Sequence, residues 1–251
     1  MSSPGDTAPI WARPAPGERK PAHTREQIAA AALAVADAEG YEAVTMRRVA
    51  AELGAGTMTL YHYVRNKAEL KALMDDAMMA ELVIPDGELA DDWRARLAQI
   101  ARRSYATFRR HPWVVDHLAT EEPPEPGGPN ALRHVEQSLA AVARTGLPLM
   151  EQMELIGLVD DYVWGHAMRT RAVRENQTPG EERIEAVIGY LEAQLATGEF
   201  PHLSAFVGDD MRASFERLVE LGRDPERFER GLQSLLDGIE MRVVAGPGTV
   251  R

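Results

Sequence analysis

The sequence of 251 residues contains no cysteine, which excludes disulfide bonds and thiolate metal sites. No apolar run approaches the roughly 18 residues that a membrane-spanning helix needs. The N-terminus also lacks a basic segment followed by an apolar one, which is the pattern of a secretory signal. We therefore expect a soluble, cytoplasmic protein.

Strand patterns are missing as well. β-Branched residues nowhere alternate with polar ones over more than a few positions, although such alternation is typical of a half-buried strand. Apolar residues recur at helical spacing instead, and we predict an all-α fold. Beyond residue 86, helices are predicted at roughly 88–110, 129–145, 148–174, 180–197, 209–222 and 225–244.

Common enzyme motifs are also absent: there is no HExxH, no glycine-rich phosphate loop and no GxSxG. The one Glu-x-x-His spacing, from Glu199 to His202, contains Pro201 and is predicted to lie at a turn. We predict that the protein is not an enzyme and has no catalytic residue, no cofactor and no metal. The alternative, an all-α metal-dependent enzyme, would use these side chains: His111, His117, Asp160, Asp161 and His166.

The net charge of −11 is unevenly distributed. Residues 1–67 hold eight of the 28 Lys/Arg and seven of the 39 Asp/Glu, a balance of +1, so the remainder carries −12. Between Thr45 and Lys67, four cations face a single acid, Glu52. This asymmetry favours one end that approaches a polyanion, and the alternative is chance unevenness in a short window.

Residues 1–23 contain five prolines and no periodicity, and they are predicted to form a disordered arm. Four helices are predicted to follow, each starting at a residue able to cap it, and the first two ending at a glycine. The predicted starts are Thr24, Thr45, Thr57 or a neighbour, and Asn66, and the ends are Gly40 and Gly54.

The segment "GAGTMTLYHYVRNK" (54–67) follows a glycine turn between the second and third helices, an arrangement typical of a helix-turn-helix. In that motif the third helix lies in the major groove of DNA. Leu60 and Val64 are predicted to face inward, helped by Met58 or Tyr61. The outward residues are predicted to be Thr57, Thr59, His62 and Tyr63, beside Arg65 and Lys67. Arg47 suits bidentate recognition of guanine. The alternative is a helical hairpin packed onto the rest of the chain.

Residues 24–72, with "VAAELG" and "TLYHYVRNKAEL", resemble the DNA-binding domain of the TetR family of bacterial transcriptional regulators. "EFPHLSAF" (199–206) and "RFERGLQSLLDGIE" (227–240) are similar to the ligand-binding domain of its tetracycline-repressor branch. The resemblance implies a helix-turn-helix domain at 24–70 and a ligand-binding and dimerisation domain at 71–251. It also implies that Thr57, Met58, Thr59, His62, Tyr63 and Arg47 read the groove, and that Thr45, Tyr61 and Lys67 contact phosphate.

Two helices are predicted to pair two copies of the chain. Residues 147–168 are apolar on most sides, and the last helix carries one apolar stripe: Phe228, Leu232, Leu235, Leu236, Ile239 and Val243. Gly231 and Gly238 would allow close helix approach. By resemblance, helices 148–174 and 225–244 form a four-helix bundle across the dimer axis, and the alternative is an ordinary monomer core.

Polar residues in apolar company predict a pocket for a small molecule. The predicted ligand-binding residues are His111, Trp113, His117, His134, Gln137, Asp161, Trp164 and His166. "DHLAT" (116–120) resembles the segment that holds the metal-binding histidine of the tetracycline repressor, but the partner carboxylate is missing from "AMRTRAVREN". We therefore expect an organic effector without a required metal. The protein is predicted to be a ligand-responsive repressor that binds a palindromic operator as a homodimer. The alternative is a ligand-independent architectural DNA-binding protein.

Overall fold

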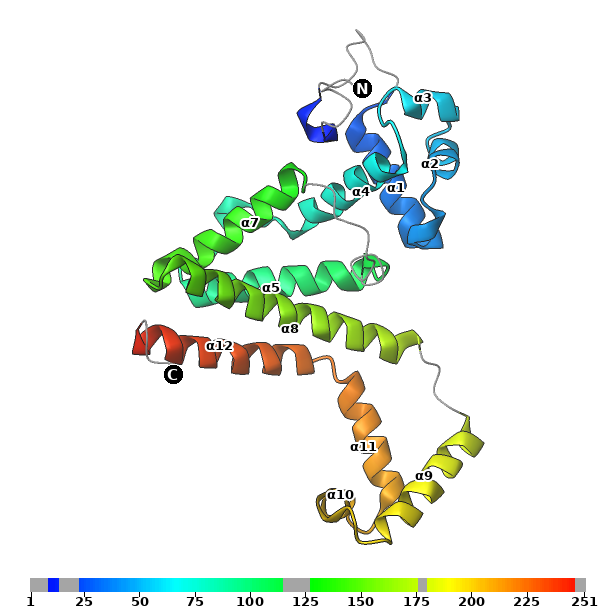
Figure 1. Cartoon of the computed structure of the whole chain (residues 1–251), viewed down its shortest axis with the longest axis vertical. Coiled ribbons are helices and arrows are strands. Elements are labelled where there is room, and N and C mark those ends of the chain that lie inside the picture. The colour runs from blue at the N-terminus through cyan, green and yellow to red at the C-terminus, as the bar shows by residue number, and fades with distance from the viewer. Residues whose placement is uncertain (1–8, 14–22, 115–126, 176–179, 247–251) are drawn as a thin grey trace, which may run out of the picture. The chain divides into compact units, whose positions relative to one another are not determined.

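The computed structural model describes residues 9–13, 23–114, 127–175 and 180–246. Every regular element within these ranges is a helix (Figure 1), so the prediction of an all-α fold is confirmed. None of the described helices is long and apolar enough to cross a membrane. The chain divides into two compact units, one formed by residues up to Trp164 together with those from Leu235 onwards, and one by Gly165–Ser234. The predicted division at residue 70 is a different one and stays a prediction.

Four helices open the first unit: α1 (Arg25–Glu39), α2 (Met46–Glu52), α3 (Thr57–Tyr61) and α4 (Lys67–Leu82). Side chains of the preceding residues cap three of them, because Thr24, Thr45 and Asn66 each accept a hydrogen bond from a backbone N–H three residues later. Gly40 and Gly54 have φ of 90° and 64°, which glycine adopts without steric cost. The predicted helix boundaries are confirmed in this part of the chain.

One apolar core joins these helices. Its fully buried members include Ile28 of α1, Val49 of α2, Leu60 of α3 and Met74 of α4. Trp113 belongs to the same core and stacks on Tyr41, with ring centroids 5.7 Å apart. Burial of these side chains is the main force that holds the short α2 and α3 in place, since helices of five to seven residues are not stable alone.

The predicted disorder of the arm is wrong for residues 9–13. Ile10–Ala12 form a 3-10 turn, and Ile10 is only 2% exposed within the core just described. Ile10 is buried in this core and Trp11 packs against it. The free energy of this apolar burial holds the segment in place despite its proline-rich surroundings. The rest of the predicted arm, residues 1–8 and 14–22, lies outside the described residues.

The remainder of the first unit is built from α5 (Trp93–Arg110), α7 (Pro129–Val142) and parts of α8 (Leu149–Glu175) and α12 (Arg227–Ala245). Short 3-10 turns lie at Tyr41–Ala43, Asp86–Glu88 and Ala143–Thr145. α5 starts later than the predicted residue 88, because Asp92 caps it by accepting a hydrogen bond from the N–H of Ala95.

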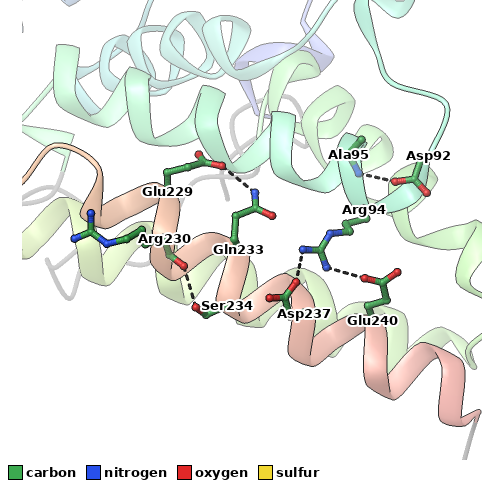
Figure 2. Close-up of polar contacts among 9 residues, drawn as sticks. All are labelled: Asp92, Arg94, Ala95, Glu229, Arg230, Gln233, Ser234, Asp237 and Glu240. Atoms are coloured by element: carbon green, nitrogen blue, oxygen red, sulfur yellow. Dashed lines mark hydrogen bonds and ion pairs between the residues drawn. The ribbon is translucent and has the colours of Figure 1, made fainter.

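Charged side chains tie α12 to its neighbours within this unit. Arg94 of α5 lies 2.5 Å from Asp237 and 2.9 Å from Glu240 of α12 (Figure 2). Arg242 of α12 lies 3.3 Å from Glu151 and 2.9 Å from Glu154 of α8. These ion pairs are partly exposed to solvent, so they add little to the free energy of unfolding. Their main effect is to fix the orientation of α12 relative to α5 and α8.

The second unit contains α9 (Glu181–Leu195), α10 (Pro201–Val207) and α11 (Met211–Arg223). Ile188, Val207 and Met211 form its small buried cluster. Pro201, predicted to lie at a turn, is instead the first residue of α10, a position that proline favours because its missing N–H is not needed there. A helix of seven residues is too short to show a period in the sequence.

The apolar stripe of α12 does not form the predicted face for a second copy. Four members of that stripe are at most 5% exposed within the single chain: Phe228, Leu232, Leu236 and Ile239. The prediction is therefore wrong for these four residues, because an apolar helical stripe is satisfied equally well by neighbours in its own chain, whereas Leu235 and Val243 are half-exposed.

Candidate DNA-binding surface and effector region

The third helix presents a mixed surface. Met58 and Tyr61 are 73% and 47% exposed, whereas Leu60 and Val64 are completely buried. Leu60 and Val64 thus face inward as predicted, but Met58 and Tyr61 do not help them. α3 ends at Tyr61 and the chain turns at His62, and this turn brings Tyr63 inward instead.

Tyr63 is the one predicted groove-reading residue that the structure buries. It is 7% exposed, and its hydroxyl accepts a hydrogen bond from the backbone N–H of His23 at 3.3 Å. The prediction that Tyr63 lies on the outside is wrong. It assumed that the helix continues past Tyr61, whereas α3 ends there and the chain turns at His62. The Tyr63 side chain packs in the apolar core shared by α1 to α4, so its ring is not available to contact a base.

The other predicted DNA contacts remain accessible. Thr45, Arg47, Met58, Tyr61, His62 and Lys67 are exposed, and Thr57 and Thr59 are partly exposed. Thr45 accepts a hydrogen bond from the N–H of Arg48 at 3.2 Å, and its hydroxyl hydrogen is still able to donate to a phosphate. Lys67 lies 3.5 Å from Glu42, an exposed pair that a phosphate is able to replace.

Arg47 and Arg48 differ in how their charges are used. The Arg48 guanidinium donates to Glu39 at 2.8 Å and to Glu52 at 2.9 Å, and these partners raise its pKa. Arg47 is exposed and has neither a hydrogen bond nor an ion pair with any residue in the described ranges. Arg47 is therefore the second-helix cation that is free to meet DNA.

Two buried carboxylates on α4 are not among the predicted site residues, and one of them, Glu69, fixes the edge of this surface. Glu69 and Asp76 of α4 are 9% and 7% exposed. Glu69 accepts a hydrogen bond from the backbone N–H of Arg65 at 2.7 Å, which fixes the turn between α3 and α4. The signal was their spacing, because Glu69, Leu73 and Asp76 share one face of α4.

Two predicted effector-binding residues prove to connect helices. His111, at the end of α5, is 2% exposed, and its Nδ1 lies 2.6 Å from Oδ1 of Asp37 on α1. Trp113 donates from Nε1 to the same oxygen at 2.8 Å. Both side chains are thus committed to contacts with α1, because a buried polar group is stable only when paired.

Gln137 is committed in the same way. Its side-chain amide accepts from the N–H of Ile84 at 3.1 Å and donates to the carbonyl oxygen of Ile84 at 2.5 Å. His134, one turn earlier on α7, differs: its Nδ1 is buried and has no hydrogen-bond partner among the described residues. Burial lowers the pKa of His134.

The remaining predicted effector residues are not gathered at one place. Trp164 packs edge-on against Phe108, with centroids 5.6 Å apart, in the first unit. His166 contacts Phe228 in the second unit, with centroids 5.3 Å apart, and its pKa is lowered by burial and by Arg227 and Arg169. Asp161 is exposed, and His117 lies outside the described residues.

Among the described residues, no group of three or more acidic or histidine side chains is arranged to hold a metal ion. Asp160, proposed above for a metal enzyme, lies at the surface next to Asp161, and partial desolvation of its carboxylate raises its pKa to about 6, with the charge of Asp161 adding to the effect.

Family models match two stretches of the chain. "Bacterial regulatory proteins, tetR family" matches residues 28–72, and "Tetracyclin repressor-like, C-terminal domain" matches residues 85–243. The transcriptional repressor DrrR1 of Streptomyces coeruleorubidus is 37% identical over 241 residues, which are 94% of this chain and 84% of that protein. A transcriptional regulator of Saccharopolyspora erythraea is 29% identical over 220 residues, which are 86% and 90% of the two chains.

Solved structures agree with these matches. ActR from Streptomyces coelicolor without ligand has a TM-score of 0.64 at 26% identity, covering 91% of this chain and 99% of that one. ActR in complex with actinorhodin has a TM-score of 0.60 at 25% identity, covering 92% and 99%. ActR has also been solved in complex with (S)-DNPA.

Proposed function

The chain belongs to the TetR family of helix-turn-helix transcriptional repressors, and we propose that it binds a palindromic operator as a homodimer that a small organic effector releases. Members of this family regulate transcription and are not enzymes. The observation that carries the proposal is the exposed surface of α3 together with Arg47 of α2, which has no partner among the described residues.

DNA recognition requires that this surface enter the major groove. The N-terminal residues of α3 meet base edges, with Thr57, Met58 and Thr59 foremost, while Tyr61 and Lys67 meet the phosphates on either side. Arg47 reaches a guanine from α2. Tyr63 is left out of this set because its ring is buried.

Self-association is proposed through α8 and α12, but by faces other than the buried stripe of α12. Met150 and Met153 of α8 are 72% and 43% exposed. On α12, the side opposite the buried stripe carries small residues and one large apolar one: Ser234, Gly238, Met241 and Ala245. Met241 is 75% exposed. Apolar side chains at such a face, with small residues between them, suit close packing of helices from a second copy.

An organic effector is supported by two observations. ActR is solved with actinorhodin and with (S)-DNPA. In this chain His134 carries a buried Nδ1 without a partner in the described ranges, and a ligand hydroxyl would satisfy it. An effector releases DNA only if it binds the non-operator arrangement of the dimer more tightly.

A mobility-shift assay tests the proposal directly. Inverted repeats upstream of the gene are labelled, wild-type protein is added, and actinorhodin and other small aromatic compounds are then titrated. We expect a shifted band that disappears as the effector is added. Binding that no compound reverses, with little preference for the inverted repeat, would instead indicate an architectural DNA-binding protein.

Analytical ultracentrifugation tests the dimer. Met153→Glu and Met241→Glu each place a charge on a proposed interface, and both are expected to shift the protein towards the monomer. Met58→Glu is the control, because Met58 is as exposed as Met241 but lies on α3. A dimer that persists in both interface variants at low micromolar concentration would exclude these faces.

A further inference from the structure

Residues 9–13 are attached to α1 by their backbone. Nη1 of Arg25 donates to the carbonyl oxygens of Ile10 at 3.1 Å and Arg13 at 3.0 Å. One guanidinium thus closes the turn against the start of α1. The buried Ile10 adds an apolar anchor to the same core.

Arg13 attaches the turn to α4. Its guanidinium forms an ion pair with Glu69, and the two side chains are only 17% and 11% exposed. Glu69 also accepts the hydrogen bond from the N–H of Arg65 that fixes the turn after α3. Through Glu69, Arg13 is therefore linked to the turn that follows α3, the helix proposed to enter the major groove.

Trp11 lies where α4 meets α7. Gly128 precedes α7, and a Cβ on it would come within 2.6 Å of Cζ2 of Trp11 and 2.4 Å of Cγ of Asp76. Trp11 and Asp76 are thus both packed directly against the backbone of Gly128.

Asp76 caps α7 from outside that helix. Its Oδ1 accepts hydrogen bonds from the backbone N–H groups of Asn130 at 2.9 Å and Ala131 at 3.1 Å. Two of the N–H groups that every helix start leaves unpaired are satisfied in this way. Trp11 covers the joint at which a side chain of α4 holds the start of α7.

We propose that residues Ile10–Arg13 form an internal brace that holds α4 against α7 in the arrangement that binds the operator, with Trp11 and Arg13 as positioning residues. The inference rests on the proposed DNA binding and adds a determinant of affinity that does not touch DNA. A dimer places both copies of α3 in the major groove only when each copy is held at the correct orientation. Apparent affinity then falls in proportion to the population with that orientation.

Substitution of Trp11 tests the brace in the full-length dimer. Trp11→Ala is expected to raise the dissociation constant for the operator about tenfold, as a tenfold loss of the competent population would. Trp11→Phe keeps most of the packing and is expected to restore affinity to within about twofold. Ala12→Ser is the control, because Ala12 lies exposed in the same turn.

The salt dependence of binding separates the brace from a DNA-contacting arm. Trp11→Ala and Arg13→Ala are expected to weaken binding without changing the slope of affinity against salt concentration, because no phosphate contact is lost. Hydrogen exchange at the amides of Asn130 and Ala131 is expected to accelerate in Trp11→Ala. A merely structural role would lower the melting temperature but leave the dissociation constant unchanged well below it.

A second pair of variants approaches the joint from α7. Gly128→Ala forces Trp11 and Asp76 away and is expected to weaken operator binding as Trp11→Ala does, whereas Gly87→Ala adds a methyl group in open space. In the double variant the two effects are expected to be less than additive, since both act on one contact.

Three results would overturn the brace: unchanged operator affinity in folded Trp11→Ala, additive effects in the double variant, or a salt slope reduced by about one in Arg13→Ala. The last result would make Arg13 a phosphate contact. Failure of the wild type to bind any inverted repeat would instead remove the proposed function.

Discussion

His111 Nδ1 lies 2.6 Å from Oδ1 of Asp37, a residue 74 positions earlier in the chain, and thereby joins the end of α5 to the end of α1. Nε2 of the same ring lies 3.2 Å from Oε2 of Glu81 on α4. A single buried imidazole therefore lies between two carboxylates, one from α1 and one from α4.

Replacement of His111 by Phe is expected to lower the free energy of unfolding by about 1 kcal/mol, because the hydrogen bond between His111 and Asp37 is lost while the exposed Asp37 is still hydrated. Urea denaturation followed by circular dichroism measures the change. His62→Phe is the matched control: His62 is exposed, and its replacement is expected to alter stability by less than about 0.5 kcal/mol. Equal stability of the two variants would mean that the His111 contact contributes nothing.

Arg47 and Arg48 offer a test of DNA recognition. Arg47→Ala is expected to weaken operator binding by about 1–3 kcal/mol and to relax specificity at one base pair. Arg48→Ala is expected to cost much less, since its guanidinium is held by Glu39 and Glu52. Fluorescence anisotropy against operators substituted at each position measures both. A larger loss in Arg48→Ala would reverse the assignment.

Tyr61 and Tyr63 form a second matched pair. The exposed Tyr61 hydroxyl is assigned to a phosphate, so Tyr61→Phe is expected to weaken binding to all sequences by about 1 kcal/mol with no change in stability. Tyr63→Phe removes only the bond from the N–H of His23, and operator affinity is expected to stay the same. For each variant, a mobility-shift titration measures operator affinity and a thermal melt measures stability. Weaker binding by Tyr63→Phe alone would contradict the structure.

Asp160 predicts a pH dependence of stability. Its pKa is raised to about 6 in the folded chain from an ordinary value of 3.8, so the folded state binds the proton more tightly than the unfolded state. This contribution is fully present below pH 4 and is lost as pH rises through 6. Asp160→Asn is therefore expected to be more stable than the wild type at pH 7.5, with the advantage shrinking to nothing near pH 4.

Urea unfolding at several pH values and one fixed protein concentration checks this expectation. Asp161→Asn is informative as well, because loss of the neighbouring charge is expected to shift the dependence of Asp160 to lower pH. Parallel stability curves for the wild type and Asp160→Asn would show that the pKa of Asp160 is not raised in the folded protein.

The helix boundaries near the N-terminus follow from adjacent residues, and the sequence alone determined them. Thr24, Thr45 and Asn66 each cap a helix through a backbone N–H three positions away. Such contacts need no partner from elsewhere in the chain. The TetR resemblance is of the same kind, since the recognition segment is continuous in sequence.

Which of two similar side chains is available depends on how the chain folds. Tyr61 is exposed and Tyr63 buried, Arg47 is unpaired in the described ranges and Arg48 paired, and Ile10 enters the core from a proline-rich arm. The physical reason is that burial and pairing depend on neighbours far away along the chain. Asp37 contacts a histidine 74 residues later, and Asp76 accepts a hydrogen bond from an asparagine 54 residues later. No local sequence pattern predicts either contact.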